Sequence, residues 1–505
     1  MKTFIFYAAW TLLLLLGYSV TANNIQISNV TTTLVTGSPN YYTIQFNISW
    51  ENSWMVSSGP ANFDAAWLFV KFKNTSGDWK RAWLNTTFSN HTAPSGSTIY
   101  CDDNTGVFLY RSTYGSGNVS WQNVQLRWEY TLNSGVPTNP EVCVLGIEMV
   151  YIPASPFYLG DGNGANESTY ALHVTDNTAV QITNTLVSGV KTDASGGDAQ
   201  ITGAGVGIDG DGGIDTDNNG TIDNASFPTG YLSFCIMKYE ITAQQWCDFL
   251  NKLNSTEYAS RTTSIVDNYG SHIGSQFGEF ITNNPYRALG GLTWMDGCAY
   301  ADWAGLRPMT ELEYEKACRG SNSTVLNEYA WGNSIKVSIS SVDAALDGTS
   351  GEIPTIGSLC NSNIYNGFNR TIRSGIFATP TSTRARAGAT YYGVMEMSGN
   401  LSEQCVTIGN IAGRSFTGLN GNGNLNANGQ ADVNYWPGIN GNSNTNIANG
   451  TYTTGVTSGA GSGQRGGSWW LTTIYAYVSN RSVASSFLIG SDTYQHGFRC
   501  VRSVP

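Results

Sequence analysis

Charged residues are scarce in this chain of 505 residues. They make up 12% of it, with 25 Lys and Arg against 36 Asp and Glu, and they form no basic run. Nucleic acids are bound by clustered cations that neutralise phosphates, so we expect no nucleic-acid partner. Aromatic residues also reach 12%, which is not the composition of a disordered protein. The balance favours rigid, loop-rich extracellular domains.

Histidine is even scarcer, with four residues in the whole chain. His91, His173, His272 and His496 are scattered without metal-ligand spacing, and no His/Cys/Asp set suits zinc or a nucleophilic triad. His496 precedes Gly497-Phe498-Arg499 and could line a pocket, although a lone surface histidine is the commoner situation.

Long apolar runs are absent after the N-terminus. Lys2 is followed by an apolar run over residues 4–16 and by the small residues Val20-Thr21-Ala22, which suit signal peptidase. The run is too short to cross a bilayer, so residues 1–22 are predicted to be a secretory signal peptide. We expect a secreted protein, extracellular or bound to the cell surface, without a membrane span.

Residues 23–144 show period-two alternation broken by turn residues. Examples are Tyr42-Thr43-Ile44-Gln45-Phe46-Asn47-Ile48-Ser49-Trp50 and Ala66-Trp67-Leu68-Phe69-Val70-Lys71-Phe72. Alternation of β-branched and aromatic residues predicts short antiparallel strands, and an Ig-like β-sandwich is the default architecture. No catalytic pair stands out there, so this domain is expected to serve display, assembly or attachment. Its cysteines Cys101 and Cys143 are the favoured disulfide pair in an oxidising compartment.

Three ordered motifs mark the rest of the chain. They are Gly305-Leu306-Arg307-Pro308-Met309-Thr310-Glu311-Leu312-Glu313-Tyr314-Glu315, Met397-Ser398-Gly399-Asn400-Leu401-Ser402-Glu403 and Arg465-Gly466-Gly467-Ser468-Trp469-Trp470-Leu471, followed by Gly497-Phe498-Arg499-Cys500. In this order they resemble the formylglycine-generating enzyme (sulfatase-modifying factor) family. The resemblance implies an α+β, C-type-lectin-like domain over residues 145–505 with much irregular structure. An Asp/Gly-rich insertion at about 161–231 interrupts it.

Helix signals support this domain. Thr242 can cap a helix over residues 243–253, a second helix is predicted from about Trp294 to Trp303, and Thr310 with Glu313 forms a capping box for a third.

The family's reactive cysteines are missing. Members that oxidise a cysteine in sulfatases carry a cysteine pair shortly after the Arg-Gly-Gly-Ser element, and those places fall near Leu471 and Ala476. Neither side chain can replace a thiol that binds copper and carries the redox chemistry. We expect no copper and no such oxidase activity. Cys405 and Cys500 could be proposed as a substitute pair, but structural bonding is favoured for them.

The resemblance also implies a disulfide. A family cysteine at the place of Cys500 bonds to the helix that precedes the Arg-Pro-Met-Thr-Glu motif. Its partner position is Ala301 here, whereas Cys298 lies one helical turn earlier on the same face. A Cys298–Cys500 bridge is therefore predicted.

A structural calcium ion is implied as well. The corresponding family segment supplies two side-chain oxygens and two backbone carbonyls, which become the carboxylates of Glu396 and Glu403 and the carbonyls of Gly399 and Leu401. A second family calcium would use residues 363–365, but its distant acidic ligand aligns with Arg373, whose cation would repel calcium. We expect that second site to be lost.

The insertion contains an EF-hand-like run with Asp215, Asp217, Asn219 and Asp223. Oxygen side chains occupy positions 1, 3 and 5 and glycine position 6, but position 12 is Ser226 instead of a bidentate glutamate. A structural calcium loop and a solvated acidic turn are equally compatible with this pattern.

A candidate ligand-binding face comprises Trp469, Trp470, Tyr475, Tyr477 and Asn480. An extended segment would place both tyrosines on one side, and in related proteins of this fold the same stretch binds ligands. The alternative is that the tryptophans belong to the core.

Together these features predict a secreted, non-catalytic structural or binding protein, such as a filament-type subunit of a cell-surface or extracellular assembly, whose partners are other protein chains or surface glycans. An oxidoreductase of the same superfamily with a non-standard site and a ligand-binding receptor with an aromatic face remain the alternatives.

Overall fold

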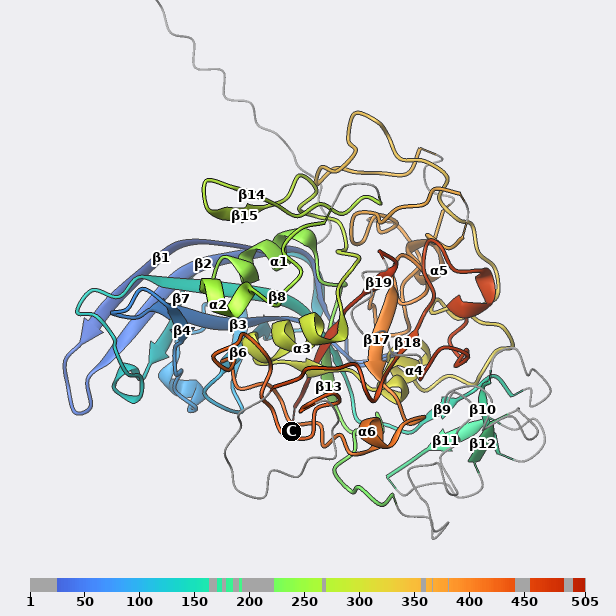
Figure 1. Ribbon diagram of the computed structural model, residues 1–505, viewed down its shortest axis with the longest axis horizontal. Coiled ribbons are helices and arrows are strands. Elements are labelled where there is room, and N and C mark those ends of the chain that lie inside the picture. Colours follow the sequence, from blue (N-terminus) through green and yellow to red (C-terminus); the bar gives the residue numbers. More distant parts are fainter. Residues whose placement is uncertain are drawn as a thin grey trace, which may run out of the picture.

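The computed structural model describes residues 25–162, 170–174, 179–184, 190–192, 222–265, 269–355, 360–365, 367–379, 381–440, 455–485 and 494–504. The fold is α+β and contains far more strand than helix, as the sequence predicts (Figure 1). The predicted signal peptide lies outside these ranges. None of the helices in the described ranges is both long and apolar enough to span a membrane.

The N-terminal strands belong to two antiparallel sheets. The smaller has the order β1-β2-β7, with β1 at Gln26–Val35, β2 at Tyr41–Met55 and β7 at Gly115–Trp128. The larger has the order β16-β20-β13-β8-β3-β6-β5, and β4 (Trp79–Arg81) also pairs with β3. The bounds are Arg307–Pro308 for β16, Cys500–Ser503 for β20, Phe234–Met237 for β13, Val142–Ile152 for β8, Asp64–Lys73 for β3, Gly106–Arg111 for β6 and Ser97–Tyr100 for β5.

Strand β3 is buried on both faces, which joins the N-terminal sheets to the rest of the molecule. Leu68 and Val70 face the core beneath the β1-β2-β7 sheet. Trp67 and Phe69 point the other way, into the main core beside the helices. The β3 run is therefore almost continuously apolar, as expected for a strand covered on both sides.

The large sheet crosses the predicted domain boundary. Residues 144 and 145 fall inside β8, which pairs with β3 on one side and with β13 on the other. Lys71 and Trp67 of β3 also donate to the carbonyls of Trp303 and Ala304, at 2.7 and 2.8 Å, just where helix α3 (Trp294–Trp303) ends. The N-terminal strands thus satisfy acceptors that the helix itself leaves open.

Short elements complete the fold. The remaining strands are β9 (Phe157–Leu159), β10 (Leu172–Val174), β11 (Val180–Ile182), β12 (Val190–Thr192), β14 (Gly274–Gln276), β15 (Glu279–Ile281), β17 (Ser402–Val406), β18 (Ser462–Arg465) and β19 (His496–Gly497). The remaining helices are α1 (Ala243–Leu250), α2 (Ser255–Tyr258), α4 (Glu311–Arg319), α5 (Arg384–Ala387) and α6 (Ile411–Arg414). The 3-10 helices are η1 (Phe88–Asn90), η2 (Tyr130–Leu132) and η4 (Thr473–Ala476).

The predicted helix starts are confirmed. Thr242 caps α1 and Thr310 caps α4, each within a capping box completed by the residue three positions on. Helix α1 ends at Leu250, three residues earlier than the sequence predicts.

Candidate functional site

The three sequence motifs meet in one place. Gly399 N donates to the carbonyl of Gly466 at 2.8 Å, which joins the second motif to the third. The Tyr314 hydroxyl on α4 donates to the carbonyl of Met397 at 2.6 Å, which joins the first to the second. In Figure 1, α4, β17 and β18 lie together in the C-terminal half of the chain.

Leu471 and Ala476, near which the resemblance places the family's cysteine pair, lie at this junction. Ala476 is fully buried against Tyr329, Trp331 and Ile364, and its carbonyl accepts from the Ser398 hydroxyl at 2.7 Å. Leu471 is half-buried. Gly467 has a φ of +63°, and an added Cβ would lie 2.9 Å from the Ala476 nitrogen. Glycine is therefore required for the close approach of this turn to η4.

A network of buried ion pairs supports the junction. Glu311 and Glu315 lie one helical turn apart on α4, and Arg465 bridges them at 3.1 and 2.7 Å. Arg481 Nε donates to Glu311 at 2.7 Å, and Arg319 contacts Glu315 at 3.2 Å. Each of these side chains is at most 1% exposed, so the charges are removed from water together.

The motif around this network could be recognised in the sequence, but the ion pairs could not. Glu311 and Glu315 are spaced i, i+4 on α4, but the arginine that pairs with both of them, Arg465, is about 150 residues away in the chain. The spacing of the carboxylates therefore does not predict their partner. In this fold the motif arginines Arg307, Arg465 and Arg499 each pair with a buried carboxylate. The Arg499–Glu403 pair, at 2.8 Å, follows the same pattern.

The predicted calcium residues Glu396 and Glu403 are both buried. Glu396 Oε1 accepts from Gly375 N at 2.9 Å, and Glu403 Oε1 accepts from Arg499 Nε at 2.8 Å. The Oε2 atom of each carboxylate is buried and has no hydrogen-bond partner. Burial raises the pKa of Glu396 to about 7.

These two unpaired carboxylate oxygens are suitable ligands for a cation. A buried acceptor without a donor is unfavourable unless it binds a cation or a proton. Arg499 already neutralises part of the charge beside Glu403. Over the described ranges, no cluster of three or more His, Cys, Asp or Glu side chains is arranged to hold a metal. The carbonyls of Gly399 and Leu401 would have to supply the other ligands.

Most of the EF-hand-like run lies outside the described residues. This applies to Asp215, Asp217 and Asn219. Asp223 is described, and it is exposed and close enough to Arg414 to favour the charged form of that guanidinium.

The predicted aromatic face is only partly a surface. Trp469 is 3% exposed and stacks on Tyr269 with ring centroids 5.2 Å apart, and Asn480 is also buried. Trp470, in contrast, is 53% exposed. The prediction that Trp469 and Asn480 contribute to a ligand face is wrong for this arrangement.

The tyrosines do not lie on an extended segment. Residues 473–476 form η4, so alternation does not place Tyr475 and Tyr477 on one side. Both are half-buried, and the Tyr477 ring packs on Tyr329 at 5.2 Å. The exposed apolar residues of this stretch are Trp470 and Ile474.

None of the nine cysteines is joined in a disulfide in this structure. The thiol pKa of every one of them is raised, and burial is the main cause in each case. Cys298 and Cys500 are fully buried in the same core, and Cys500 contributes to the raised pKa of Cys298. Their disulfide stays a prediction that the proximity favours.

The predicted Cys101–Cys143 bridge does not fit the fold. Cys101 follows β5 and Cys143 lies in β8, with β3 and β6 between these strands in the sheet. Strands are ~4.8 Å apart, so three spacings separate the two cysteines by about 14 Å across the sheet, and the register offsets them further along the strands. A disulfide requires Cα atoms less than about 7 Å apart.

His496 is also placed differently from the surface position favoured by the sequence. It is 4% exposed, and burial lowers its pKa to about 4. It is therefore a neutral, buried side chain at ordinary pH.

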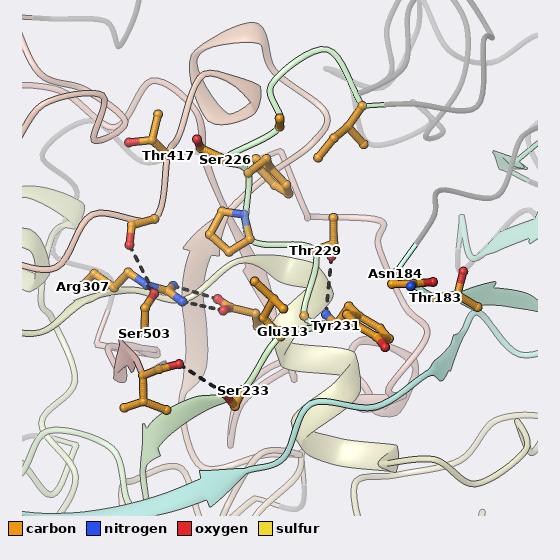
Figure 2. A pocket seen from close by; sticks show the side chains of 18 residues that line it. Thr183, Asn184, Ser226, Thr229, Tyr231, Ser233, Arg307, Glu313, Thr417 and Ser503 are labelled. Atoms are coloured by element: carbon orange, nitrogen blue, oxygen red, sulfur yellow. Dashed lines mark hydrogen bonds and ion pairs between the residues drawn. The ribbon is translucent and has the colours of Figure 1, made fainter. Parts of the chain in front are cut away.

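A cavity of about 610 Å³ opens beside the start of α4. Arg307 and Glu313 line it as a bidentate pair at 2.6 and 2.9 Å, and Arg307 also donates to Ser503 at 2.8 Å (Figure 2). Residues 225–233 and Thr417 supply hydroxyl and apolar groups. Because the guanidinium is already paired, the cavity has a neutral lining. This cavity could not be predicted from the sequence, because its walls come from segments that are far apart in the chain.

Comparison with known proteins shows the family of the chain. A family model described as the sulfatase-modifying factor enzyme 1-like domain matches residues 196–504. The match covers more than half of the 505 residues, so the chain belongs to this family.

One curated relative is the formylglycine-generating enzyme of Thermomonospora curvata. It is 41% identical over 58 residues, which are 12% of this chain and 18% of that protein. The chain thus matches less than one fifth of the relative's length.

Proposed function

We propose that this chain is a secreted, non-catalytic protein that acts by binding or assembly at the cell surface or in an extracellular structure. The observation that carries the proposal is the loss of thiol chemistry where the family has its cysteine pair. Leu471 and Ala476 occupy those places, and burial raises the pKa of every cysteine in the chain.

A thiolate, and not a thiol, is the nucleophile and the copper ligand. Cys405 and Cys500, the cysteines considered as substitutes, have their thiol pKa raised by desolvation. Both are fully buried, so neither combines the access and the acidity that the chemistry needs. We therefore expect no copper.

The buried ion-pair network supports a scaffold role for this domain. Breaking a buried ion pair by removing one partner is strongly unfavourable, so Glu311, Arg465 and Arg481 stay necessary for the fold even when the reaction is lost. The C-type-lectin-like topology of the family region and a structural calcium ion at Glu396 and Glu403 belong to the same proposal.

The exposed side chains at the junction support a binding role. Trp470 and Ile474 project from the surface next to Leu471, where the family has its reactive centre. Exposed aromatic residues on a rigid support make effective contact points for proteins or sugars. A receptor that uses this surface is the second candidate, and it differs from an assembly subunit in its partner.

The test compares the purified full chain with the formylglycine-generating enzyme of Thermomonospora curvata as a positive control. Copper content and turnover of a cysteine peptide are measured, and the native protein is imaged for ordered polymers. We expect polymers without copper or turnover. Stoichiometric copper with turnover would contradict the proposal and favour the oxidoreductase alternative, whereas a strictly monomeric protein that binds glycans through Trp470 would favour the receptor.

A further inference from the structure

The two edges of the β1-β2-β7 sheet differ in whether another segment of the chain hydrogen-bonds to them. The β7 edge is covered over residues 125–128 by the segment around η1. Thr92 and Gln125 exchange backbone hydrogen bonds at 2.8 and 3.1 Å, and Asn85 N donates to the Arg127 carbonyl at 3.0 Å. Arg127 N in turn donates to His91 Nδ1 at 3.1 Å.

The β1 edge has no such cover. Within the part of the chain that the structure describes, residues 27–35 hydrogen-bond through their backbone to β2 alone. In Figure 1, β1 runs along the outer margin of the N-terminal sheets. A row of outward-pointing N–H and C=O groups is therefore available for pairing with another strand.

Strand β1 also lacks the features that usually protect an edge. Its ten residues, Gln-Ile-Ser-Asn-Val-Thr-Thr-Thr-Leu-Val, contain no charge and no proline. The edges of the large sheet are protected by being short: β5 has four residues and β16 two. One bulge between Ser28 and Thr31 interrupts β1, which leaves residues 31–35 as a regular, open and uncharged segment.

We infer that residues 31–35 of β1 pair antiparallel with the same residues of a second copy of this chain. This inference rests on the proposed assembly function and names its contact surface. A second copy fits because the segment is uncharged and self-complementary, so the repulsion between two chains of net charge −11 is least at this strand. The pairing joins two three-stranded sheets into one continuous sheet.

The residues are self-complementary about a two-fold axis at Thr33. That register sets Thr33 opposite Thr33, Thr32 opposite Leu34, and Thr31 opposite Val35 of the second copy. Leu34 shares the inner face with Thr32, because they lie opposite Tyr42 and Ile44 of β2, yet it is 44% exposed. Pairing would cover Leu34 from both copies, and the β-branched pairs Thr33–Thr33 and Thr31–Val35 would stabilise the joined sheet.

Five paired residues make a small contact beside the ~1,200–2,000 Å² buried in stable interfaces. Association through this edge alone should therefore depend on concentration. Because a two-fold contact closes on itself, this edge joins copies in pairs, and a longer polymer would need a second contact elsewhere on the chain.

The test places a charge at the two-fold axis. Thr33 is exposed, so Thr33→Lys should fold normally and set two cations opposite each other in the dimer. Mass is measured by sedimentation velocity across a range of concentrations for wild type, Thr33→Lys, Thr33→Glu and their mixture. Gln122→Lys, an exposed position on β7, is the matched control.

We expect each Thr33 variant alone to lose self-association at least tenfold, the equimolar mixture of Thr33→Lys and Thr33→Glu to regain it, and Gln122→Lys to behave as wild type. Thr33→Cys should also form a disulfide-linked dimer on mild oxidation, because opposite Cβ atoms in a ladder are ~4.5–5.5 Å apart. Gln122→Cys should not.

The outcomes separate this inference from the proposed function. Polymers that form equally well with Thr33→Lys would overturn the edge pairing and leave the assembly function standing. Dimers lost with Thr33→Lys but never extended into polymers would support the edge and count against the filament role. A wild type that stays monomeric at every concentration, without cross-linking at Thr33→Cys, would overturn both the edge pairing and the assembly role and leave the receptor as the remaining candidate.

Discussion

The Glu311→Gln substitution tests how much the buried ion-pair network contributes to stability. Glu311 accepts five hydrogen bonds. The two to Oε2 come from Arg465 and Arg481 Nε, and the three to Oε1 come from the Thr407 hydroxyl, Ile408 N and a second nitrogen of Arg481. Glutamine retains one carbonyl oxygen for the Oε1 contacts. Its amide nitrogen then faces two guanidinium donors.

The expected loss follows from these contacts. Two charge-assisted hydrogen bonds disappear, at ~1.5–3 kcal/mol each, which predicts about 3–6 kcal/mol. Measurements on other broken buried ion pairs give ~3–5 kcal/mol, because the remaining charge stays buried without a partner. We therefore expect the variant to lose about 3–5 kcal/mol of stability around α4.

Hydrogen exchange of the amides in α4 measures this free energy where it acts, even if the whole chain does not unfold in one step. Glu279→Gln, on the exposed strand β15, is the control and should change the opening free energy by less than ~0.5 kcal/mol.

The pH dependence offers a second check. Arg481 and Arg465 lower the pKa of Glu311 against the opposing effect of burial. The folded pKa thus lies below the unfolded value of 4.5, and the stabilisation is present above 4.5 and lost as pH falls through the folded pKa. The difference between wild type and Glu311→Gln should shrink in acid. A loss below ~1 kcal/mol at neutral pH would refute the reasoning, as would a difference that does not change with pH.

Three further predictions concern other parts of the same region. Burial lowers the pKa of Lys316 from 10.5 to about 7. Between these two pH values the unfolded state binds more protons than the folded state. The free energy of unfolding attributable to Lys316 should therefore rise with pH, by up to ~1.4 kcal/mol per pH unit. The urea midpoints of wild type and Lys316→Met are measured at pH 7 and pH 9, and their difference removes the contribution of cysteine ionisation, which both proteins share. A difference that is the same at both pH values would contradict the prediction. Gly467→Ala should destabilise by ~1–3 kcal/mol, because it combines a positive φ with a contact to Ala476, whereas Gly77→Ala, with positive φ and open space around it, should lose only about 1 kcal/mol. Chelation by EGTA should lower the melting temperature of wild type but not of Glu396→Gln, and an unchanged wild-type temperature would remove the proposed calcium ion.

Local features of the fold could be predicted from sequence because their causes are local. The alternation over residues 42–50 and 66–72 identifies the strands β2 and β3, since side chains of a strand alternate between faces. Thr310 with Glu313 marks the start of α4, since a capping box satisfies backbone donors within four residues. Family membership followed from the order of the motifs alone.

The candidate site was predicted only in part, because burial depends on distant segments. The sequence placed Trp469 and Trp470 together on a possible surface, yet Tyr269 covers the first and leaves the second exposed. The Cys101–Cys143 pairing failed for the same reason, since two other strands lie between these cysteines.

The sequence by itself thus determined the family, the strand and helix positions and the absence of thiols at Leu471 and Ala476, all of which are written in residue type and short-range order. The tertiary structure alone decided which arginines neutralise Glu311 and Glu315, that β3 and β8 share one sheet, and that β1 keeps an open edge. These features depend on contacts between residues far apart in the chain, and the geometry that brings them together exists only once the core has packed.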